Sequence, residues 1–130
     1  MEKIKVIIDW CNNYGAASDE VLGCVATHKT FAGVKEAYTS ALEFHLEGME
    51  NDEIPAKLQG EYELEFEMTA QALLHHFDGI ITRAALSRIT GINERQLGHY
   101  MTRYRRPRPA QRLKIVNGLN CIGKELTAVM

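Results

Sequence analysis

The segments EYELEFEM, residues 61–68, and TAQALLHHF, residues 69–77, adjoin in the sequence and have different hydrophobic periods. In the first segment an apolar side chain follows every glutamate, which is the two-residue period of a half-buried β-strand. In the second segment the apolar residues recur at helical spacing, which predicts an α-helix. The change of period predicts a strand-containing part up to residue 68 and a helical part from residue 69.

The charges divide at the same place. Residues 1–68 contain five Lys or Arg and 14 Asp or Glu, a net charge of −9, and residues 69–130 contain ten and three, a net charge of +7. The whole chain of 130 residues carries only −2, so its net charge conceals two oppositely charged halves. A basic half favours a polyanionic partner, most often nucleic acid. An acidic half favours a basic protein partner, or only solvation.

The acidic half has the pattern of a small α+β domain. Alternation predicts strands over residues 3–10, 14–18 and 24–28, with Gly23 interrupting the chain before the third. Thr30 is placed to cap a helix over residues 31–49, whose apolar stripe repeats at helical spacing. With the strand over residues 61–68, the order is β-β-β-α-β, and we expect the helix to cover one face of the sheet.

Four glutamates lie on one face of the last predicted strand: Glu61, Glu63, Glu65 and Glu67. Such a row protects an exposed sheet edge against aggregation. It also gives a strip of negative potential on which a basic protein could land. The pattern does not choose between a solvated edge and a partner-binding strip.

The basic half has the spacing of a helix-turn-helix. Thr82 is placed to cap a helix over residues 83–89, Gly91 permits a tight left-handed turn, and Asn93 is placed to cap a helix over residues 94–102. Gln96 would complete a capping box with Asn93. Four apolar residues would pack the two helices together: Leu86, Ile92, Leu97 and Tyr100. This spacing fits the Cro and lambda-repressor class, although Thr90 stands where an apolar residue is commoner.

The chemistry around the second of these helices favours DNA. Side chains that can read base edges are expected on its outer face: Asn93, Glu94, Arg95, His99 and Thr102. Cations suited to phosphate contacts follow it: Arg103, Arg105, Arg106, Arg108 and Arg112. A last helix should begin at Pro109, with an apolar stripe that completes the core or forms a dimer seam: Leu113, Val116, Leu119, Ile122 and Leu126. Gly118 and Gly123 favour a break in that helix.

Taken together, these features resemble a HicB-family antitoxin. The residues that carry the resemblance are Ile8–Trp10, the run LGCVAT at residues 22–27, ALEFHLEGM at residues 41–49, and ALSRITGINERQLGHYMTRYRRPRPAQRLKIV at residues 85–116. The last of these looks like the DNA-binding half of a Bacteroides-type subgroup. The sequence departs from many relatives in lacking prolines at residues 18–22 and in carrying His28 and Lys29 where a glycine is common.

The resemblance implies a fold and two partners. Residues 1–68 would form a partial RNase H-like domain that binds a small, basic, HicA-like toxin that cleaves mRNA. Residues 69–130 would form a separate all-α, Cro/lambda-repressor-like helix-turn-helix domain. That domain would bind the operator of its own operon as a homodimer or larger assembly. In this interpretation the protein is a cytoplasmic antitoxin and repressor that needs no cofactor or metal.

Two other functions stay open. A solitary transcription regulator would bind DNA in the same way, with an acidic domain that dimerises or senses a ligand. An RNA-processing metal enzyme would need carboxylates that converge on divalent ions. Asp9 lies on an early strand without an evident companion set, and we find no catalytic motif, so we expect no enzyme. The N-terminal segment lacks a signal-peptide pattern, and no apolar run approaches the length of a membrane span.

Overall fold

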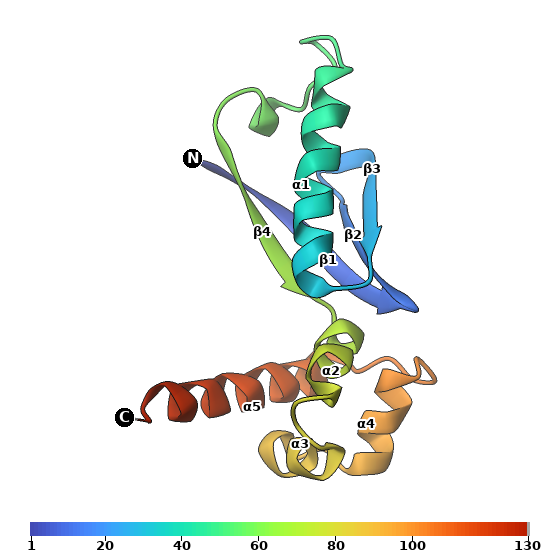
Figure 1. The fold of residues 1–130 in the computed structure, drawn as a ribbon, viewed down its shortest axis with the longest axis vertical. Helices are drawn as coiled ribbons and strands as arrows, with labels where there is room; N and C mark the ends of the chain where they lie inside the picture. Colours follow the sequence, from blue (N-terminus) through green and yellow to red (C-terminus); the bar gives the residue numbers. More distant parts are fainter. Residues whose placement is uncertain (130) are drawn as a thin grey trace. The chain divides into compact units, whose positions relative to one another are not determined.

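The structure is a computed structural model that describes residues 1–129. Its contacts group into two compact units, Met1–Ala72 and Leu73–Met130. The first contains one four-stranded sheet and a long helix, and the second contains helices only (Figure 1).

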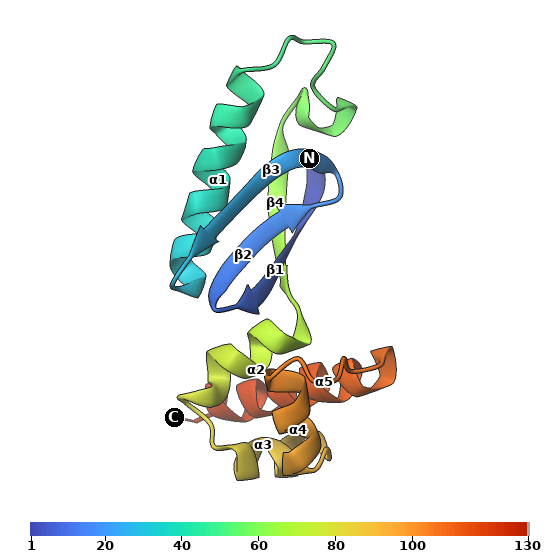
Figure 2. The same ribbon diagram turned by 90° about the vertical axis from the view of Figure 1, so that its right-hand side faces the viewer.

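The sheet of the first unit has the strand order β3-β2-β1-β4. Its strands are β1 (Glu2–Cys11), β2 (Asn13–Ser18), β3 (Val21–His28) and β4 (Tyr62–Met68). The first three form an antiparallel meander, whereas β4 pairs parallel to β1, so β3 and β4 are the two edges. Helix α1 (Phe31–Glu47) covers one face of this sheet and leaves the other face uncovered by any element of the unit (Figures 1 and 2). A short 3-10 helix, η1 (Ala56–Leu58), precedes β4.

The core of the first unit lies between α1 and the sheet. The inward residues of β1 (Ile4, Val6 and Ile8) meet the buried stripe of α1, and every member of that stripe is fully enclosed: Val34, Tyr38 and Leu42. The predicted helical stripe and the predicted alternation of β1 are therefore confirmed. Burial, above all, raises the pKa of Tyr38 to about 12, with a smaller contribution from the neighbouring Cys24.

The third strand begins earlier than predicted. Gly23 was expected to interrupt the chain, but β3 starts at Val21 and continues through the glycine. The backbone of Gly23 has φ +82°, and the register with β2 shifts between Ala17 and Ser18. A glycine adopts this left-handed conformation without a steric penalty, so the strand continues past the irregularity instead of ending there.

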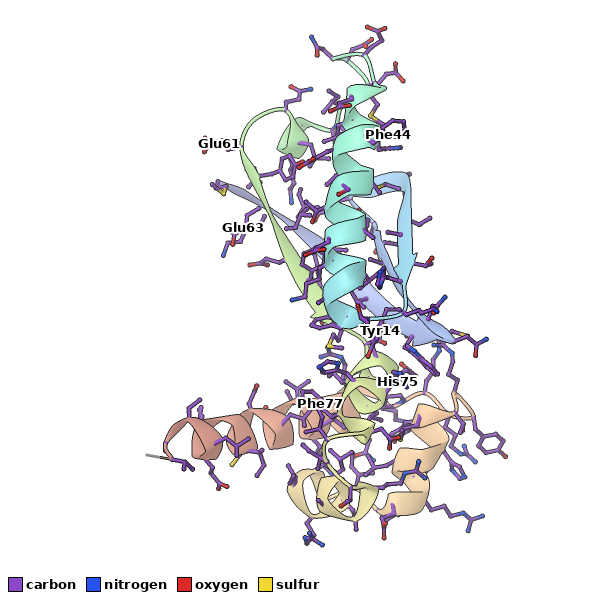
Figure 3. The ribbon with its side chains drawn as sticks, in the orientation of Figure 1. Tyr14, Phe44, Glu61, Glu63, His75 and Phe77 are labelled. Carbon is purple, nitrogen blue, oxygen red and sulfur yellow. The ribbon has the colours of Figure 1, made fainter. Side chains whose placement is uncertain are left out.

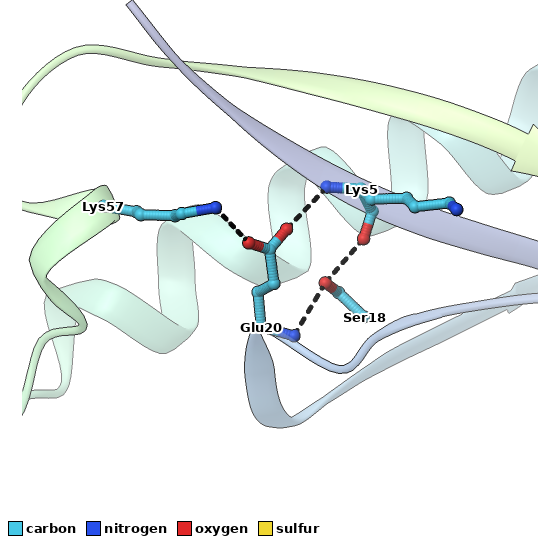
Figure 4. A network of polar contacts seen from close by, with 4 residues as sticks. All are labelled: Lys5, Ser18, Glu20 and Lys57. Carbon is cyan, nitrogen blue, oxygen red and sulfur yellow. Dashed lines mark hydrogen bonds and ion pairs between the residues drawn. The ribbon is translucent and has the colours of Figure 1, made fainter.

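A polar network closes the end of the sheet where β2 stops pairing with β1 (Figure 4). The Glu20 carboxylate accepts the backbone N–H of Lys5 at 2.9 Å and the Lys57 ammonium at 2.6 Å. The Ser18 hydroxyl donates to the Lys5 carbonyl at 2.6 Å and accepts the N–H of Glu20 at 3.1 Å. The hydrogen bond from Lys57, followed by that from Lys5, lowers the pKa of Glu20. The side chains of Glu20 and Ser18 thus bind the backbone N–H and carbonyl of Lys5, which β2 does not pair with.

The helices of the second unit start and stop at the expected signals. They are α2 (Ala70–Asp78), which begins in the first unit, α3 (Arg83–Thr90), α4 (Glu94–Met101) and α5 (Pro109–Thr127). The Thr82 hydroxyl accepts the N–H of Ala85, and the Asn93 side chain accepts the N–H of Gln96. Gly91 ends α3 with φ +76°. The four residues predicted to pack α3 and α4 together are all buried: Leu86, Ile92, Leu97 and Tyr100.

The expected fold class, a partial RNase H-like domain followed by a Cro/lambda-repressor-like helix-turn-helix domain, is wrong. The chain is α+β, with one sheet followed by helices, and residues 1–129 give no evidence of a separate Cro/lambda-repressor-like domain after an RNase H-like one. Thr69 alone separates β4 from α2, and it is bound to β1 through Ile8 (N···O 2.9 Å) and Asp9 (Oγ1···Oδ1 2.7 Å). Ala72, inside α2, belongs to the core of the sheet unit. Helix α2 thus follows β4 directly, because Ala72 in its first turn is part of the core of the sheet unit.

The last helix also differs from its prediction. It runs unbroken from Pro109 to Thr127, and its buried face is centred on Ile115 and Gly118. Two members of the predicted apolar stripe are exposed instead, Leu113 at 57% and Leu126 at 66%. A Cβ atom on Gly118 would lie 2.8 Å from the Ile89 carbonyl oxygen. The glycine therefore allows α5 to lie close to Ile89 of α3, and this packing holds the helix unbroken at Gly118.

Candidate functional site

The turn between α3 and α4 is held by a polar residue. Thr90 is 6% exposed; its hydroxyl donates to the Leu86 carbonyl at 2.7 Å and accepts the N–H of Ile92 at 3.2 Å. A buried hydroxyl that both donates and accepts carries little desolvation penalty. Thr90, which departs from the expected apolar pattern, therefore ties the end of α3 to the first residues after Gly91.

The predicted base-reading residues fall into two groups. Glu94 and Arg95 are exposed on the first turn of α4. Asn93 is exposed too, but its side-chain oxygen already accepts the N–H of Gln96 at 2.8 Å. The Thr102 hydroxyl donates to the Gly98 carbonyl at 3.1 Å, and His99 is half-buried with its ring 4.9 Å from that of Tyr104. Glu94 and Arg95 are thus the members best placed to reach a partner.

Arginines gather around a hollow beside α4. The hollow has a volume of about 470 Å³, and we call it the arginine hollow; it is lined by Gln96, Tyr100, Tyr104, Arg105, Arg106, Arg108 and Gln111. Its three arginines are all exposed. Tyr100 lies at its base, 2% exposed, and its hydroxyl oxygen accepts the side-chain amides of Gln96 (3.0 Å) and Gln111 (3.4 Å). Three guanidinium groups around one concavity produce a concentrated positive potential.

The other two predicted phosphate-binding arginines lie elsewhere. Arg103 and Arg112 are half-buried and are not among the residues that line the arginine hollow. Arg103 follows the C-cap of α4 with φ +65°, a left-handed conformation that is uncommon for a residue with a Cβ atom. The chain reverses there, with the Arg105 N–H donating to the His99 carbonyl at 3.2 Å. This reversal turns Arg105 and its neighbours back toward α4.

Sequence reasoning missed four residues of the arginine hollow: Gln96, Tyr100, Tyr104 and Gln111. Tyr100 was assigned to packing, and Gln96 was assigned to a capping box, whereas its amide nitrogen donates along the helix to Tyr100. The available signal was Tyr104, an aromatic residue inside the run RYRRPR. It is 70% exposed, and the Arg105 guanidinium lies 5.6 Å from its ring centre.

The glutamate strip of β4 is partly neutralised. Parallel pairing places β1 beside β4, and Lys3 and Lys5 form ion pairs with Glu65 (3.2 Å) and Glu67 (2.9 Å). Within residues 1–129 no ion pair involves Glu61 or Glu63, which flank the outer side of the strand in Figure 3. The strip therefore presents a weaker negative potential than four unpaired carboxylates would.

Among residues 1–129, no three His, Cys, Asp or Glu side chains are grouped so as to hold a metal ion. The carboxylate of Asp9 accepts the Thr69 hydroxyl and the N–H of Trp10 at 2.8 Å, which gives it a structural role at the start of α2. In the same residues no helix has the length and apolar character needed to cross a membrane.

Comparisons with known proteins add no relative. No protein-family model matches the chain, and no curated protein or solved structure matches it.

Proposed function

We propose that the second unit binds double-stranded DNA, with the first turn of α4 facing base edges and the arginine hollow beside a phosphate. The arginine hollow is the observation that carries this proposal. Arg105, Arg106 and Arg108 lie around one concavity directly after the helix whose first turn exposes Glu94 and Arg95. Guanidinium groups bind phosphate through paired N–H donors, and Arg95 has the donors to bind a guanine edge in the same way.

In our proposal the protein is a cytoplasmic, HicB-like antitoxin that represses its own operon. The acidic first unit would occlude a small, basic, HicA-like toxin, and the second unit would read the operator. The charge division supports this assignment. Residues 1–68 carry a net charge of −9, which attracts a basic protein, and residues 69–130 carry a net charge of +7, which attracts DNA. The protein acts by binding, with no catalytic step and no cofactor.

Two copies of the chain would act together on DNA, because one helix contacts too few base pairs to give useful specificity. The second unit has an apolar groove of about 490 Å³ between the end of α2, α3 and α5, which offers a surface for a second copy. Ile80, 71% exposed, and Leu126 lie in it. Sedimentation of the full chain and of Ile80→Ser tests this: the substitution should shift the assembly toward the monomer.

The DNA proposal is tested with the fragment upstream of the gene and a scrambled fragment of equal length. Arg95→Ala should reduce the preference for the upstream fragment, whereas Arg105→Ala should weaken binding to both and lower the salt slope by about one. Arg88→Ala is a control, since this exposed arginine of α3 lies outside the arginine hollow. Affinities that do not depend on salt would contradict the proposal.

The antitoxin proposal is tested by growth. The small open reading frame beside the gene is induced alone and together with this protein. Growth arrest that the protein relieves supports an antitoxin. Sequence-specific DNA binding without any toxic neighbour would instead support the solitary regulator, whose acidic unit dimerises or senses a ligand.

A further inference from the structure

The edge strand β3 and the second half of α1 enclose a groove with a volume of about 420 Å³. We call it the β3–α1 groove, and Gly23, Val25, Phe44, His45 and Met49 are among its lining residues. It belongs entirely to the first unit, and it lies at the edge of the sheet opposite to β4 and its glutamates. Figure 3 shows Phe44 near the C-terminal end of α1.

Large apolar side chains are exposed around this groove. Among the lining residues, Phe44 is 79% exposed and Val25 is 69% exposed; Leu22, which is 81% exposed, precedes Gly23 in the chain but does not line the groove. The core side of α1 is already complete with Val34, Tyr38 and Leu42, so Phe44 adds nothing to that core. One exposed apolar residue is ordinary, but several beside one groove at an unpaired strand edge are typical of an interaction surface.

A polar atom in the groove also lacks a partner. The Nε2 atom of His45 is buried, and no hydrogen bond to it is found among residues 1–129. The ring lies against Gly23, since a Cβ atom there would be 3.6 Å from His45 Cε1. Buried side-chain nitrogens are normally hydrogen-bonded, so this atom has unused hydrogen-bonding capacity beside the groove.

The charge around the groove specifies the kind of partner. Residues 36–56 contain six carboxylates and no Lys or Arg. Glu47 adjoins the lining residue Gly48, Glu50 adjoins the lining residue Met49, and both carboxylates are exposed. Within residues 1–129 no ion pair involves either of them, in contrast to Glu65 and Glu67 of β4. An apolar centre with a rim of one charge is complementary to an apolar side chain flanked by cations.

We propose that the β3–α1 groove is the docking site for a basic protein partner, which inserts an apolar side chain beside Phe44 and places Lys or Arg against Glu47 and Glu50. The proposal rests on the proposed function, because it assigns the toxin-binding surface of the antitoxin. It moves that surface from the glutamates of β4 to the opposite edge of the sheet.

The test starts with a defined probe that needs no toxin. The full chain is used to select peptides from a phage-displayed library of random 16-residue sequences, and the selected peptides are synthesised. We expect peptides with Lys or Arg around an aromatic or aliphatic residue. Phe44→Ser and Glu47→Lys/Glu50→Lys should each weaken peptide binding about tenfold or more, as for the central residues of an interface.

Matched controls separate this groove from general charge effects. Glu61→Lys/Glu63→Lys makes the same change of charge at the other edge of the sheet, beyond the screening length of about 8 Å at physiological salt. Leu113→Ser removes an exposed apolar side chain from the second unit. Both controls should change peptide affinity less than about twofold. Equal losses in the Glu61/Glu63 variant, or no loss in Phe44→Ser, would overturn the proposal.

Two further measurements decide what occupies the groove. In the growth assay, Phe44→Ser should lose protection and keep DNA binding unchanged. Peptide binding that depends on Phe44, with no toxin to neutralise, would support the groove and reject the antitoxin function. Sedimentation in which Phe44→Ser converts a dimer of this chain to monomers would show that a second copy fills the groove, which would overturn a basic partner.

Discussion

At the scale of single residues, two buried hydroxyl groups have different roles: that of Thr90 forms hydrogen bonds that hold a turn, and that of Tyr38 has a raised pKa. The hydroxyl of Thr90 is fully used, because it donates to Leu86 and accepts from Ile92. The hydroxyl of Tyr38 is enclosed in the apolar core between α1 and the sheet, where its ionised form is disfavoured. The first residue holds a turn in place, whereas the second makes the stability of the sheet unit depend on pH.

Replacing Thr90 with valine should destabilise the second unit. Valine has nearly the same shape but cannot accept the N–H of Ile92, a residue that is 3% exposed. A buried N–H that loses its partner costs about 1–3 kcal/mol in the free energy of unfolding. Urea denaturation of Thr90→Val should show a lower midpoint with an unchanged m-value. Thr90→Ser, which keeps the hydroxyl, should lose much less, and an equal loss in both variants would contradict this role of the hydroxyl.

Tyr38 should make the protein less stable at alkaline pH. Its pKa is about 12 in the folded state against 10 in the unfolded chain, so the folded state holds the proton more tightly. The free energy of unfolding is therefore unaffected below pH 10 and falls between pH 10 and 12, by at most about 1.4 kcal/mol per pH unit. Denaturant titrations at pH 9 and 11 measure this fall. Tyr38→Phe should reduce the fall, and a fall of the same size in that variant would exclude Tyr38 as its origin.

At the scale of secondary-structure elements, local signals predict most helices and strands, but they do not predict which face of a helix is buried or which strand pairs with which. Helix α5 starts at Pro109 as expected, yet it turns Gly118 to the core and Leu113 to solvent. Strand β4 alternates as expected, yet its partner across the sheet is β1, sixty residues earlier in the chain. In both cases an element distant in the sequence determines the outcome: α3 determines which side of α5 is buried, and β1 determines the pairing of β4.

The two glycines of α5 should respond in opposite ways to substitution by alanine. At Gly118 a Cβ atom would lie 2.8 Å from the Ile89 carbonyl oxygen and 2.9 Å from its Cγ2, so Gly118→Ala should cost about 1–3 kcal/mol. At Gly123 no such atom lies within 4 Å, so Gly123→Ala should gain up to about 1 kcal/mol from helix propensity. Thermal unfolding by circular dichroism compares the pair. Similar shifts in melting temperature for both variants would show that α3 does not pack this closely on α5.

At the scale of the whole molecule, the segregation of charge matters more than its sum. A chain with −9 on residues 1–68 and +7 on residues 69–130 can attract another copy of itself, since opposite halves of two molecules are complementary. The small net charge of −2 provides little general repulsion between molecules.

The full chain should therefore associate at low ionic strength and disperse on addition of salt. Static light scattering at about 20 mM and about 300 mM NaCl should give a higher apparent mass at the lower salt, because the Debye length falls from over 20 Å to about 6 Å. Arg105→Glu/Arg106→Glu, which lowers the positive charge of the second unit, should reduce the association. An apparent mass that rises with salt would point to apolar contacts instead, such as those of the groove beside Ile80.

The sequence alone determined the elements and the charge division. Strand alternation, the caps Thr30, Thr82 and Asn93, and the turn at Gly91 depend on residues within about four positions of one another, so they could be predicted. The exposed cations after α4 could be predicted for the same reason.

Only the tertiary structure decided which of these residues act together. The parallel pairing of β4 with β1 brings Lys3 and Lys5 to the glutamates and weakens the predicted strip. The first residues of α2 belong to the sheet unit, so the division between the two compact units falls inside that helix and not between residues 68 and 69. Tyr100 and Gln111, eleven residues apart, meet at the base of the arginine hollow. These contacts depend on how separate elements pack, and local sequence patterns do not predict which residues of separate elements come into contact.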